Sequence, residues 1–536
     1  MKNILEITKG LGIPDECVIP YGFDKAKIDL KYFDQLKDKK GGKLVLVTAC
    51  CNAEVAGMGK TSTEIAVNQS LNYLGVKSIA CLREPSLGVS MNGKGTATGA
   101  LNARVLPDSI NYHFNGDIHA LTTTINLIAA QIDNVIYQGN ELNIDPSKIT
   151  WKRALDMNDR ELRQVAIGQG KDVNGIKRED GFEITVASEL MAILCISKDR
   201  NDFKERIKRI IVGFTFDDKP VYLKDLKIVN AVMKLMNNAL KPNLVQTREN
   251  NPCLIHGGPF ANIAHGCSSL IATKLALKLS PIVITEAGFA ADLGAEKFLD
   301  IKARVGGLHV DCSVLVATIR ALKMHGGVKF EDLGNENLVA LKEGSKNMLQ
   351  HYYNLRKYDI PVVVAINHFE SDTKEEIELL SSILRENNIP FAFADGFLNG
   401  GDGSIELARK VKEVLDTKPS KYHPLYKLED TIENKINIIA KEIYRAKDVE
   451  FSPLAKEHIK KIEEMHRSNL VVCMAKTQNS FSDNKTLLNC PRDFTLKVND
   501  VKLKNGADFI VVMCGDILTM PGLPKIPAAV KMELDQ

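Results

Sequence analysis

Short runs of apolar, β-favouring residues recur along the chain, and a stretch of helix-favouring sequence follows each of them. The runs are continuously apolar, which is typical of strands buried on both faces in a parallel sheet. Strands that alternate with helices predict an α/β fold. In such sheets ligands bind at the carboxyl ends of the strands, so the residues after each run are the first candidates for a functional site. The runs lie at residues 43–49, 77–82, 281–285, 313–317, 360–366, 389–393, 469–473 and 508–513.

The length of the chain limits the number of domains. At roughly 150 residues per domain, 536 residues correspond to about three or four domains. Hydrophobic residues make up 44% and charged residues 26% of the chain, which is typical of globular proteins and excludes a disordered, collagen-like or coiled-coil chain. Shifts in composition predict parts at 1–344, 345–447 and 448–536.

The net charge and the cysteines indicate which binding partners and which cellular compartment to expect. Lys and Arg number 70 and Asp and Glu 67, a surplus of +3, which is too small to predict binding of nucleic acid or of an anionic membrane surface. No apolar run approaches the roughly 18 residues that a membrane-spanning helix needs, and residues 1–10 lack the apolar core of a signal peptide. The 11 cysteines form no CxxC pair, a pattern that favours reduced thiols and predicts a cytoplasmic protein.

A glycine-rich loop follows the first buried run. A loop that leads from a strand into a helix presents backbone N–H groups and the helix N-terminus to phosphate groups. Lys60 is expected to reach the β- and γ-phosphates of a nucleotide, and the Thr61 hydroxyl to bind Mg²⁺. The full P-loop pattern has glycine where Glu54 stands, so the alternative is a turn in which the glycines only redirect the chain. The candidate loop comprises Glu54, Val55, Ala56, Gly57, Met58, Gly59, Lys60 and Thr61.

Charged residues near strand ends are candidates for ion binding. Arg83 follows the run 77–82 and offers a planar fork that suits a carboxylate or a phosphate; the alternative is a solvent-exposed pair with Glu84. Asp117 lies in a turn, where an acid either serves a metal or only shapes the turn. Glu286 follows the run 281–285, where it is expected either to bind Mg²⁺ through water or to cap the next helix.

A histidine-containing loop and two phenylalanines complete the candidate groups. His256 and His265 lie in a glycine-rich segment whose spacing fits no standard zinc pattern. We interpret it as a close-packed active-site loop, with a purely structural loop as the alternative. Phe369 and Phe397 follow two further runs, where they either sandwich a flat heterocycle or close the core.

Longer stretches of the sequence resemble formate–tetrahydrofolate ligases (10-formyltetrahydrofolate synthetases), and the resemblance covers the chain almost from end to end. So many matching stretches in one order are specific to a family. They lie at 83–88, 139–145, 149–153, 156–160, 178–182, 256–267, 285–298, 321–328 and 520–529.

The resemblance implies an ATP-dependent ligase. In that family formate attacks the γ-phosphate of MgATP to give formyl phosphate, and N10 of tetrahydrofolate then takes up the formyl group. It implies that loop 54–61 holds ATP and Mg²⁺, with Lys60 and Arg83 as catalytic residues and Arg83 placed to hold formate. It further implies that Glu84 and Asp117 serve a monovalent cation (K⁺ or NH₄⁺), and that Phe369 and Phe397 stack on the folate.

The resemblance also implies an architecture and an assembly. The expected fold is α/β, with a P-loop NTPase-like, mostly parallel sheet domain (1–344), a second α/β domain that contributes to the folate site (345–447) and a C-terminal α/β domain (448–536). The expected protein is a cytoplasmic homotetramer that acts on the small molecules formate, ATP and tetrahydrofolate.

The loops at the expected active site depart from the family pattern. Glu54, Val55 and Met58 stand in place of Thr, Pro and Glu, and the run 99–101 (Gly-Ala-Leu) stands in place of three glycines. Nearby, Arg104 stands in place of glutamine. Because these changes gather around the reacting phosphate, a second hypothesis is a weakened or repurposed relative that binds nucleotide or folate as a sensor or subunit.

A third hypothesis is a P-loop GTPase or maturation ATPase. It is prompted by Asn367, which follows a predicted strand where loops that read guanine lie. Such loops require a lysine next and an aspartate two residues further, but His368, Phe369 and Glu370 follow here. The sequence therefore disfavours this hypothesis.

Overall fold

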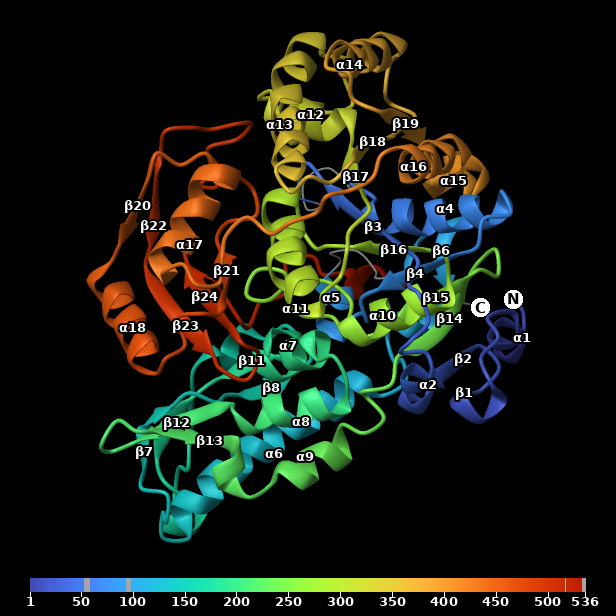
Figure 1. Ribbon diagram of the computed structural model, residues 1–536. Helices are drawn as coiled ribbons and strands as arrows, with labels where there is room; N and C mark the ends of the chain where they lie inside the picture. Colours follow the sequence, from blue (N-terminus) through green and yellow to red (C-terminus); the bar gives the residue numbers. More distant parts are fainter. Residues whose placement is uncertain (53–57, 93–97, 516, 533–536) are drawn as a thin grey trace.

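A large mixed sheet forms the centre of the molecule in the computed structural model, which describes residues 1–52, 58–92, 98–515 and 517–532 (Figure 1). Neighbouring strands in the middle of this sheet run parallel, and their residues are almost entirely buried because helices cover the sheet. In spatial order the parallel strands are β15 (Pro252–Ile255), β4 (Ser78–Leu82), β16 (Ile282–Glu286), β3 (Lys43–Ala49), β17 (Cys312–Ala317), β18 (Val362–Asn367) and β19 (Phe391–Ala394).

One edge of the sheet is antiparallel. β14 (Asn243–Thr247) pairs with β15, and it also pairs with β2 (Lys25–Ile28) and β6 (Ala103–Leu106). The outer strands there are β1 (Val18–Tyr21), which pairs with β2, and the two-residue β5 (Gly99–Ala100), which forms a hairpin with β6.

Helices between the strands pack on the sheet and on one another. α4 (Lys60–Tyr73) contacts β3, β4 and β16, and α16 (Ile405–Thr417) contacts both α4 and β19. α10 (Leu270–Leu279) packs on β4 and β16. The hairpin-like pair α12 (Ile319–His325) and α13 (Leu338–Arg356) follows β17.

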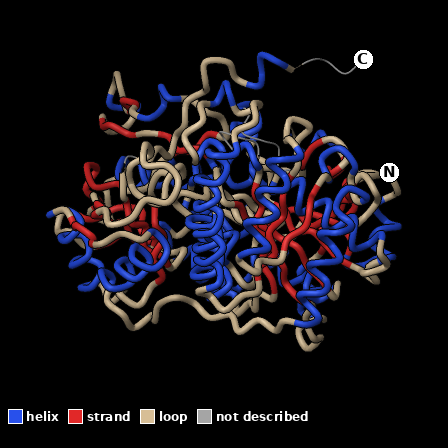
Figure 2. Tube along the Cα trace, turned by 90° about the horizontal axis from the view of Figure 1, so that it is seen from above, coloured by secondary structure: helices blue, strands red, loops and turns tan. Residues whose placement is uncertain are grey.

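Two lobes extend from the central sheet (Figure 1), and Figure 2 shows helices packed around the strands. The green and teal lobe contains a small sheet of β13 (Pro220–Tyr222), β12 (Ile211–Thr215) and β7 (Ile144–Ile149). Its helices are α6 (Asp117–Tyr137), α7 (Glu189–Ile196), α8 (Arg200–Lys208) and α9 (Val229–Leu235). The orange and red lobe carries β21 (Val471–Ala475), β24 (Phe509–Met513) and β23 (Asp500–Lys504), with α17 (Ile432–Ile439) and α18 (Pro453–Glu464).

The predicted α/β class and the predicted strands are confirmed. Each of the apolar runs forms a strand: those from 43–49 to 389–393 form β3, β4, β16, β17, β18 and β19 of the central sheet, and the last two form β21 and β24. Because β18 and β19 belong to the segment 345–447, that segment shares its sheet with the segment 1–344. The borders near 344 and 447 stay predictions.

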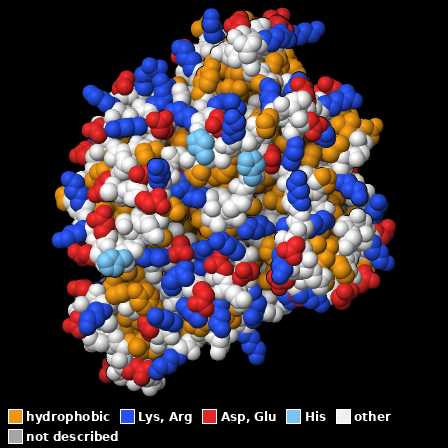
Figure 3. Space-filling model, viewed as in Figure 1, with side chains coloured by type: hydrophobic (Ala, Val, Ile, Leu, Met, Phe, Trp, Pro, Cys, Tyr) orange, Lys and Arg blue, Asp and Glu red, His pale blue; other side chains and the backbone are white. Residues whose placement is uncertain are grey.

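The surface carries both signs of charge. On the face seen in Figure 3, Lys and Arg side chains are intermingled with Asp and Glu side chains, and neither sign forms a continuous field. Within the described ranges, no helix is long and apolar enough to cross a membrane.

Candidate active site

The carboxyl ends of β3, β16 and β4 bring several of the expected site residues to one edge of the sheet. β16 pairs with β3 on one side and with β4 on the other, and its last residue is Glu286. Arg83 follows β4 directly, and Lys60 begins α4 after the loop that leaves β3. The side chains that follow the two outer strands therefore flank the carboxylate at the end of the middle one.

Glu286 links the two sides of this edge. Its Oε2 accepts a hydrogen bond of 3.0 Å from the Thr61 hydroxyl, and its Oε1 lies 3.3 Å from Nη2 of Arg83. The Glu286 side chain is only 3% exposed, whereas that of Arg83 is 29% exposed. A buried carboxylate thus holds both a hydroxyl and a guanidinium that still faces the surface.

Arg83 has hydrogen-bond donors that Glu286 does not use. Its Nε is buried and has no hydrogen-bond partner among the described residues. A guanidinium offers five N–H donors in a planar fork, and a buried donor without a partner costs free energy. The arrangement suits an anionic ligand that would accept from the free side of Arg83.

Lys60 lies inside the protein beside these groups. It is buried at the first position of α4, and burial lowers the pKa of its ammonium to about 8, against the opposing effect of the nearby Glu286 carboxylate. A cation held at a helix N-terminus, with little solvent around it, is a strong attractor for a phosphate group.

Asn367 fixes the second half of the glycine-rich loop. Its side-chain amide donates a hydrogen bond of 3.1 Å to the carbonyl of Met58. Gly59, the residue before α4, has φ of 67°, and a Cβ there would lie 2.5 Å from the Asn367 amide nitrogen. The glycine is therefore required both by the backbone angle and by the close approach of Asn367. The expected phosphate-binding residues Glu54, Val55, Ala56 and Gly57 lie outside the described residues.

Asp117 is held by a lysine and an asparagine. Lys27 Nζ lies 2.7 Å from Oδ1 of Asp117, and the Asn243 amide donates to Oδ2 at 2.8 Å. Burial and the neighbouring Asp117 carboxylate raise the pKa of Glu84 well above its usual range, and Oε2 of Glu84 has no partner within the described part of the chain. Of the two groups expected to serve a cation, Glu84 therefore has an oxygen without a partner but is held toward its neutral form, whereas Lys27 already neutralises Asp117.

Loop 256–267 packs against this cluster. The Glu84 N–H donates to the Gly257 carbonyl at 2.7 Å, and a Cβ on Gly258 would lie 2.4 Å from the Glu84 carbonyl oxygen. His256 is buried, with its ring nitrogens 2.6 Å from the Ser269 hydroxyl and from the Ala239 carbonyl, and burial lowers its pKa to about 4. His256 is therefore neutral and structural, within a loop that supports the site.

No group of three or more His, Cys, Asp or Glu side chains in the described ranges could hold a metal ion.

Phe369 and Phe397 lie beyond the ends of β18 and β19. The guanidinium of Arg320 covers one face of the Phe369 ring, at 5.5 Å from its centroid. Phe397, in the short helix α15 (Gly396–Asn399), is 43% exposed. Arg320 thus already stacks on Phe369, and the exposed ring of Phe397 can stack on a flat ligand.

The hairpin β5–β6 reaches across to α15. The Asn102 N–H donates to the Phe397 carbonyl at 3.3 Å, and the Asn102 amide also bonds the Leu398 carbonyl. Leu101, at the tip, is 49% exposed and has a φ of 46°, a conformation that glycine adopts readily and leucine rarely. The residues that depart from the family pattern at 99–101 thus directly precede a residue that bonds α15.

Several partners of the site could not be expected from the sequence. Lys27, Asn243 and Arg320 come from distant segments and carry no motif. Glu286 had a signal, its place directly after a buried strand, but the sequence did not indicate that it joins Thr61 to Arg83.

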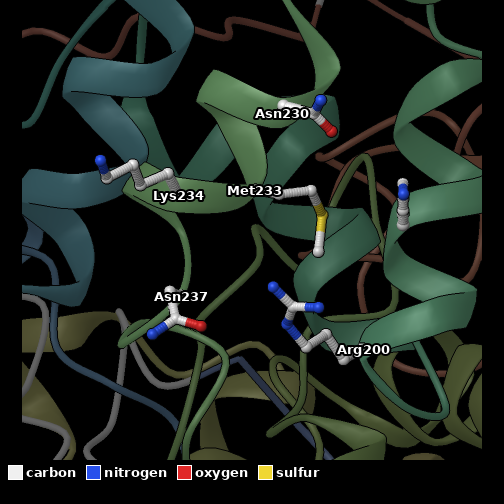
Figure 4. A pocket seen from close by; sticks show the side chains of 6 residues that line it. Arg200, Asn230, Met233, Lys234 and Asn237 are labelled. Atoms are coloured by element: carbon white, nitrogen blue, oxygen red, sulfur yellow. The ribbon is translucent and has the colours of Figure 1, made fainter.

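A separate pocket lies between α8 and α9, away from this edge (Figure 4). It has a volume of about 290 Å³, and Figure 4 shows the Arg200 guanidinium turned toward Met233 and the Lys234 ammonium turned away from it. The expected site residues do not line this pocket. Its lining consists of Arg200, Lys204, Asn230, Met233, Lys234 and Asn237.

A comparison with known families agrees with the resemblance read from the sequence. A family model described as Formate--tetrahydrofolate ligase matches residues 1–536, the whole chain.

Proposed function

Because the chain belongs to the formate–tetrahydrofolate ligase family, which implies ATP-dependent joining of formate to tetrahydrofolate, we propose that it carries out this reaction at the edge formed by β3, β16 and β4. The site is P-loop NTPase-like: loop 54–61 and the start of α4 bind the triphosphate, and Lys60 contacts its β- and γ-phosphates.

In the first step an oxygen of formate attacks the γ-phosphorus of ATP. A P–O bond forms, the bond between the γ-phosphorus and the β,γ-bridging oxygen breaks, and ADP leaves with that oxygen. Arg83 binds formate through the donors that Glu286 leaves free, and its charge stabilises the negative charge that grows on the transferred phosphoryl group. Lys60 neutralises the leaving ADP from the other side.

In the second step N10 of tetrahydrofolate attacks the carbonyl carbon of formyl phosphate. The C–N bond forms, the C–O bond to phosphate breaks, and the amine proton leaves with phosphate or solvent. Phe369 and Phe397 hold the pterin by stacking, which places N10 next to the bound intermediate.

Two inorganic cations accompany the proposal. Mg²⁺ when bound to ATP withdraws charge from the β- and γ-phosphate oxygens. The Thr61 hydroxyl, an oxygen donor at the start of the helix, fits it as a ligand. For K⁺ or NH₄⁺ the fit is partial, because one Glu84 oxygen has no partner among the described residues, whereas Asp117 is bonded to Lys27.

The observation that carries the proposal is the shared carboxylate at the end of β16. It holds a hydroxyl of the nucleotide-binding helix on one oxygen and, on the other, an arginine whose buried Nε has no partner in the part of the chain that the structure describes. Nucleotide and a small carboxylate would therefore meet within a few bond lengths, as transfer of a phosphoryl group to formate requires.

Labelled formate tests this mechanism directly. When formate carries ¹⁸O in both oxygens, one of them becomes the bridging oxygen of formyl phosphate and leaves with the phosphate. We expect one ¹⁸O atom in each phosphate released in the presence of tetrahydrofolate. Unlabelled phosphate alongside 10-formyltetrahydrofolate would exclude formyl phosphate as the intermediate.

A second candidate is a weakened or repurposed relative that binds nucleotide or folate as a sensor or subunit. Leu101 supports it, because a bulky side chain at a positive φ directly precedes Asn102, which bonds the Phe397 carbonyl at the expected folate site. Nucleotide or folate binding without ligation in the labelled-formate experiment would favour this candidate.

We also propose a cytoplasmic homotetramer. The cytoplasmic part is supported by the cysteines, all 11 of which are free thiols, as a reducing compartment maintains them. The tetramer follows from the family resemblance, and sedimentation of the purified protein would test it.

A further inference from the structure

Glu286 has two hydrogen-bonding oxygens, and each serves a different substrate of the proposed reaction. Oε2 accepts from the hydroxyl of Thr61, which we assign to Mg²⁺, and Oε1 accepts from Arg83, which we assign to formate. We infer that Glu286 is a positioning residue that aligns the magnesium ligand with the formate ligand. This inference rests on the proposed function.

On the Thr61 side, Glu286 sets the direction of a hydroxyl. A threonine hydroxyl has one proton and two lone pairs. When the proton points to Glu286 at 3.0 Å, the lone pairs point away from it. Those lone pairs are what a metal ion accepts, so the carboxylate behind the hydroxyl orients the ligand that faces the nucleotide.

On the Arg83 side, Glu286 sets the plane of a guanidinium. It takes one N–H of Nη2 at 3.3 Å, and Nε remains without a partner in the part of the chain that the structure describes. Because the guanidinium is flat, fixing one of its nitrogens limits where the remaining donors point. The free donors are thereby fixed relative to Thr61, through a single carboxylate.

Burial makes Glu286 suited to this task. Its side chain is 3% exposed at the end of a strand that is hydrogen-bonded on both sides, so it has little freedom to turn. The same carboxylate lies near Lys60 and favours its charged form, so the cations Lys60 and Arg83 share one counter-ion.

The number of acceptors, not the volume of the side chain, is what this role requires. A carboxylate accepts from both Thr61 and Arg83. The amide in Glu286→Gln has nearly the same shape but one acceptor oxygen and one NH₂ donor. With its oxygen on Arg83, the amide can only donate to the Thr61 hydroxyl, which then no longer points its lone pairs away from residue 286. Glu286→Asp is shorter but keeps two acceptors.

The test compares the two variants in ATP-, formate- and folate-dependent turnover and in binding of a non-hydrolysable ATP analogue with and without Mg²⁺. We expect Glu286→Gln to lower kcat/KM for formate by about 10- to 100-fold and to reduce by a similar factor the gain in analogue affinity that Mg²⁺ brings. Affinity without Mg²⁺ should stay within about twofold, and Glu286→Asp should retain more activity than Glu286→Gln.

Glu296→Gln is the matched control. Glu296 is also a buried acid, ten residues further along the chain, and neither of its carboxylate oxygens has a hydrogen-bond partner among the described residues. We expect this variant to keep its formate KM and its response to Mg²⁺.

Three outcomes would overturn the inference. They are a Gln variant that matches the wild-type protein, a Gln variant that is more active than the Asp variant, and the failure of both Glu286 variants to fold. Failure of the proposed function looks different, because the wild-type protein itself would then form no product.

Discussion

At Lys60, burial and a neighbouring charge have opposite effects on the pKa. Burial removes water from the ammonium, and the Glu286 carboxylate compensates only in part, so the pKa falls to about 8. In the proposed complex the triphosphate of a nucleotide would supply the missing negative charge and favour the ammonium form. Burial therefore makes the Lys60 ammonium less stable in the free protein, and a bound phosphate group would stabilise it.

This balance predicts a pH dependence of nucleotide binding. Lys60 loses its proton as the pH rises through about 8, and the nucleotide binds the protonated form better. Affinity for an ATP analogue should therefore be constant below that pH and fall by up to about tenfold per unit above it. Fluorescence titration between about pH 7 and pH 10 measures this. In Lys60→Arg the guanidinium stays charged, so affinity for the analogue should not fall with rising pH. A wild-type affinity that does not change with pH would contradict the assignment.

At the scale of elements, the loop between β3 and α4 depends on a neighbouring strand. Asn367 at the end of β18 bonds the Met58 carbonyl, which gives this asparagine a role in shaping the loop. The hypothesis of a GTPase assigned Asn367 to guanine recognition, but one N–H of its amide donates to the Met58 carbonyl here. Preference for ATP over GTP in a competition titration would agree with this contact.

Removal of the Asn367 amide should loosen the loop. We expect Asn367→Ala to weaken binding of an ATP analogue by about tenfold, because the Met58 carbonyl loses its donor. Asn387→Ala, at the end of α14 (Lys374–Glu386), is a suitable control and should bind like the wild-type protein. Equal affinities in all three proteins would show that the contact does not shape the nucleotide site.

The hairpin β5–β6 gives a second element-scale prediction. Glycines at Ala100 and Leu101 remove side chains next to Asn102, which bonds the Phe397 carbonyl, and relieve the φ of 46° at Leu101. Relief of the positive φ stabilises the fold by about 1 kcal/mol. The greater conformational entropy of glycine in the unfolded chain costs about the same, so the melting temperature should stay nearly unchanged. We expect the double variant Ala100→Gly with Leu101→Gly to lower KM for tetrahydrofolate. A loss of activity at unchanged stability would mean that the pocket serves another ligand.

The strands that could be predicted are those with continuous apolar runs. β3, β17 and β18 are buried along nearly their whole lengths, so their sequences carry the signal of a parallel sheet. β14 escaped prediction because Asn243, Gln246 and Thr247 interrupt the apolar pattern, although all three are buried. Their polar groups find partners across the sheet edge, such as Asp117 for Asn243, and a local pattern does not reveal such partners.

At the scale of the whole molecule, the C-terminal lobe is tied to the central sheet by buried charge. Lys476, which follows β21, lies 2.7 Å from Asp292, and both are almost fully buried. Asn479, nearby in the chain, accepts a hydrogen bond from Asn52 at 3.2 Å, next to the nucleotide loop. Glu286, the last residue of β16, could be predicted as a site residue because it directly follows an apolar run. The contacts that hold the C-terminal lobe near it could not be predicted, because they join residues far apart in the sequence.

The buried ion pair predicts a large loss of stability in one variant and a smaller loss in another. Lys476→Met leaves Asp292 buried without its cation, which should cost about 3–5 kcal/mol in urea unfolding. Adding Asp292→Asn removes the unpaired charge, so the double variant should be more stable than Lys476→Met alone. A double variant that is as unstable as the sum of the single variants would mean that the two residues act independently.

The central claim is that the whole molecule is a ligase whose substrates meet at the edge formed by β3, β16 and β4. The most direct measurement is formation of 10-formyltetrahydrofolate from MgATP, formate and tetrahydrofolate in the presence of potassium, detected by acid conversion to the methenyl form. We predict product that requires all three substrates and is lost in Arg83→Ala, which should still bind nucleotide. A folded protein that forms no product, beside an active member of the family, would contradict the claim.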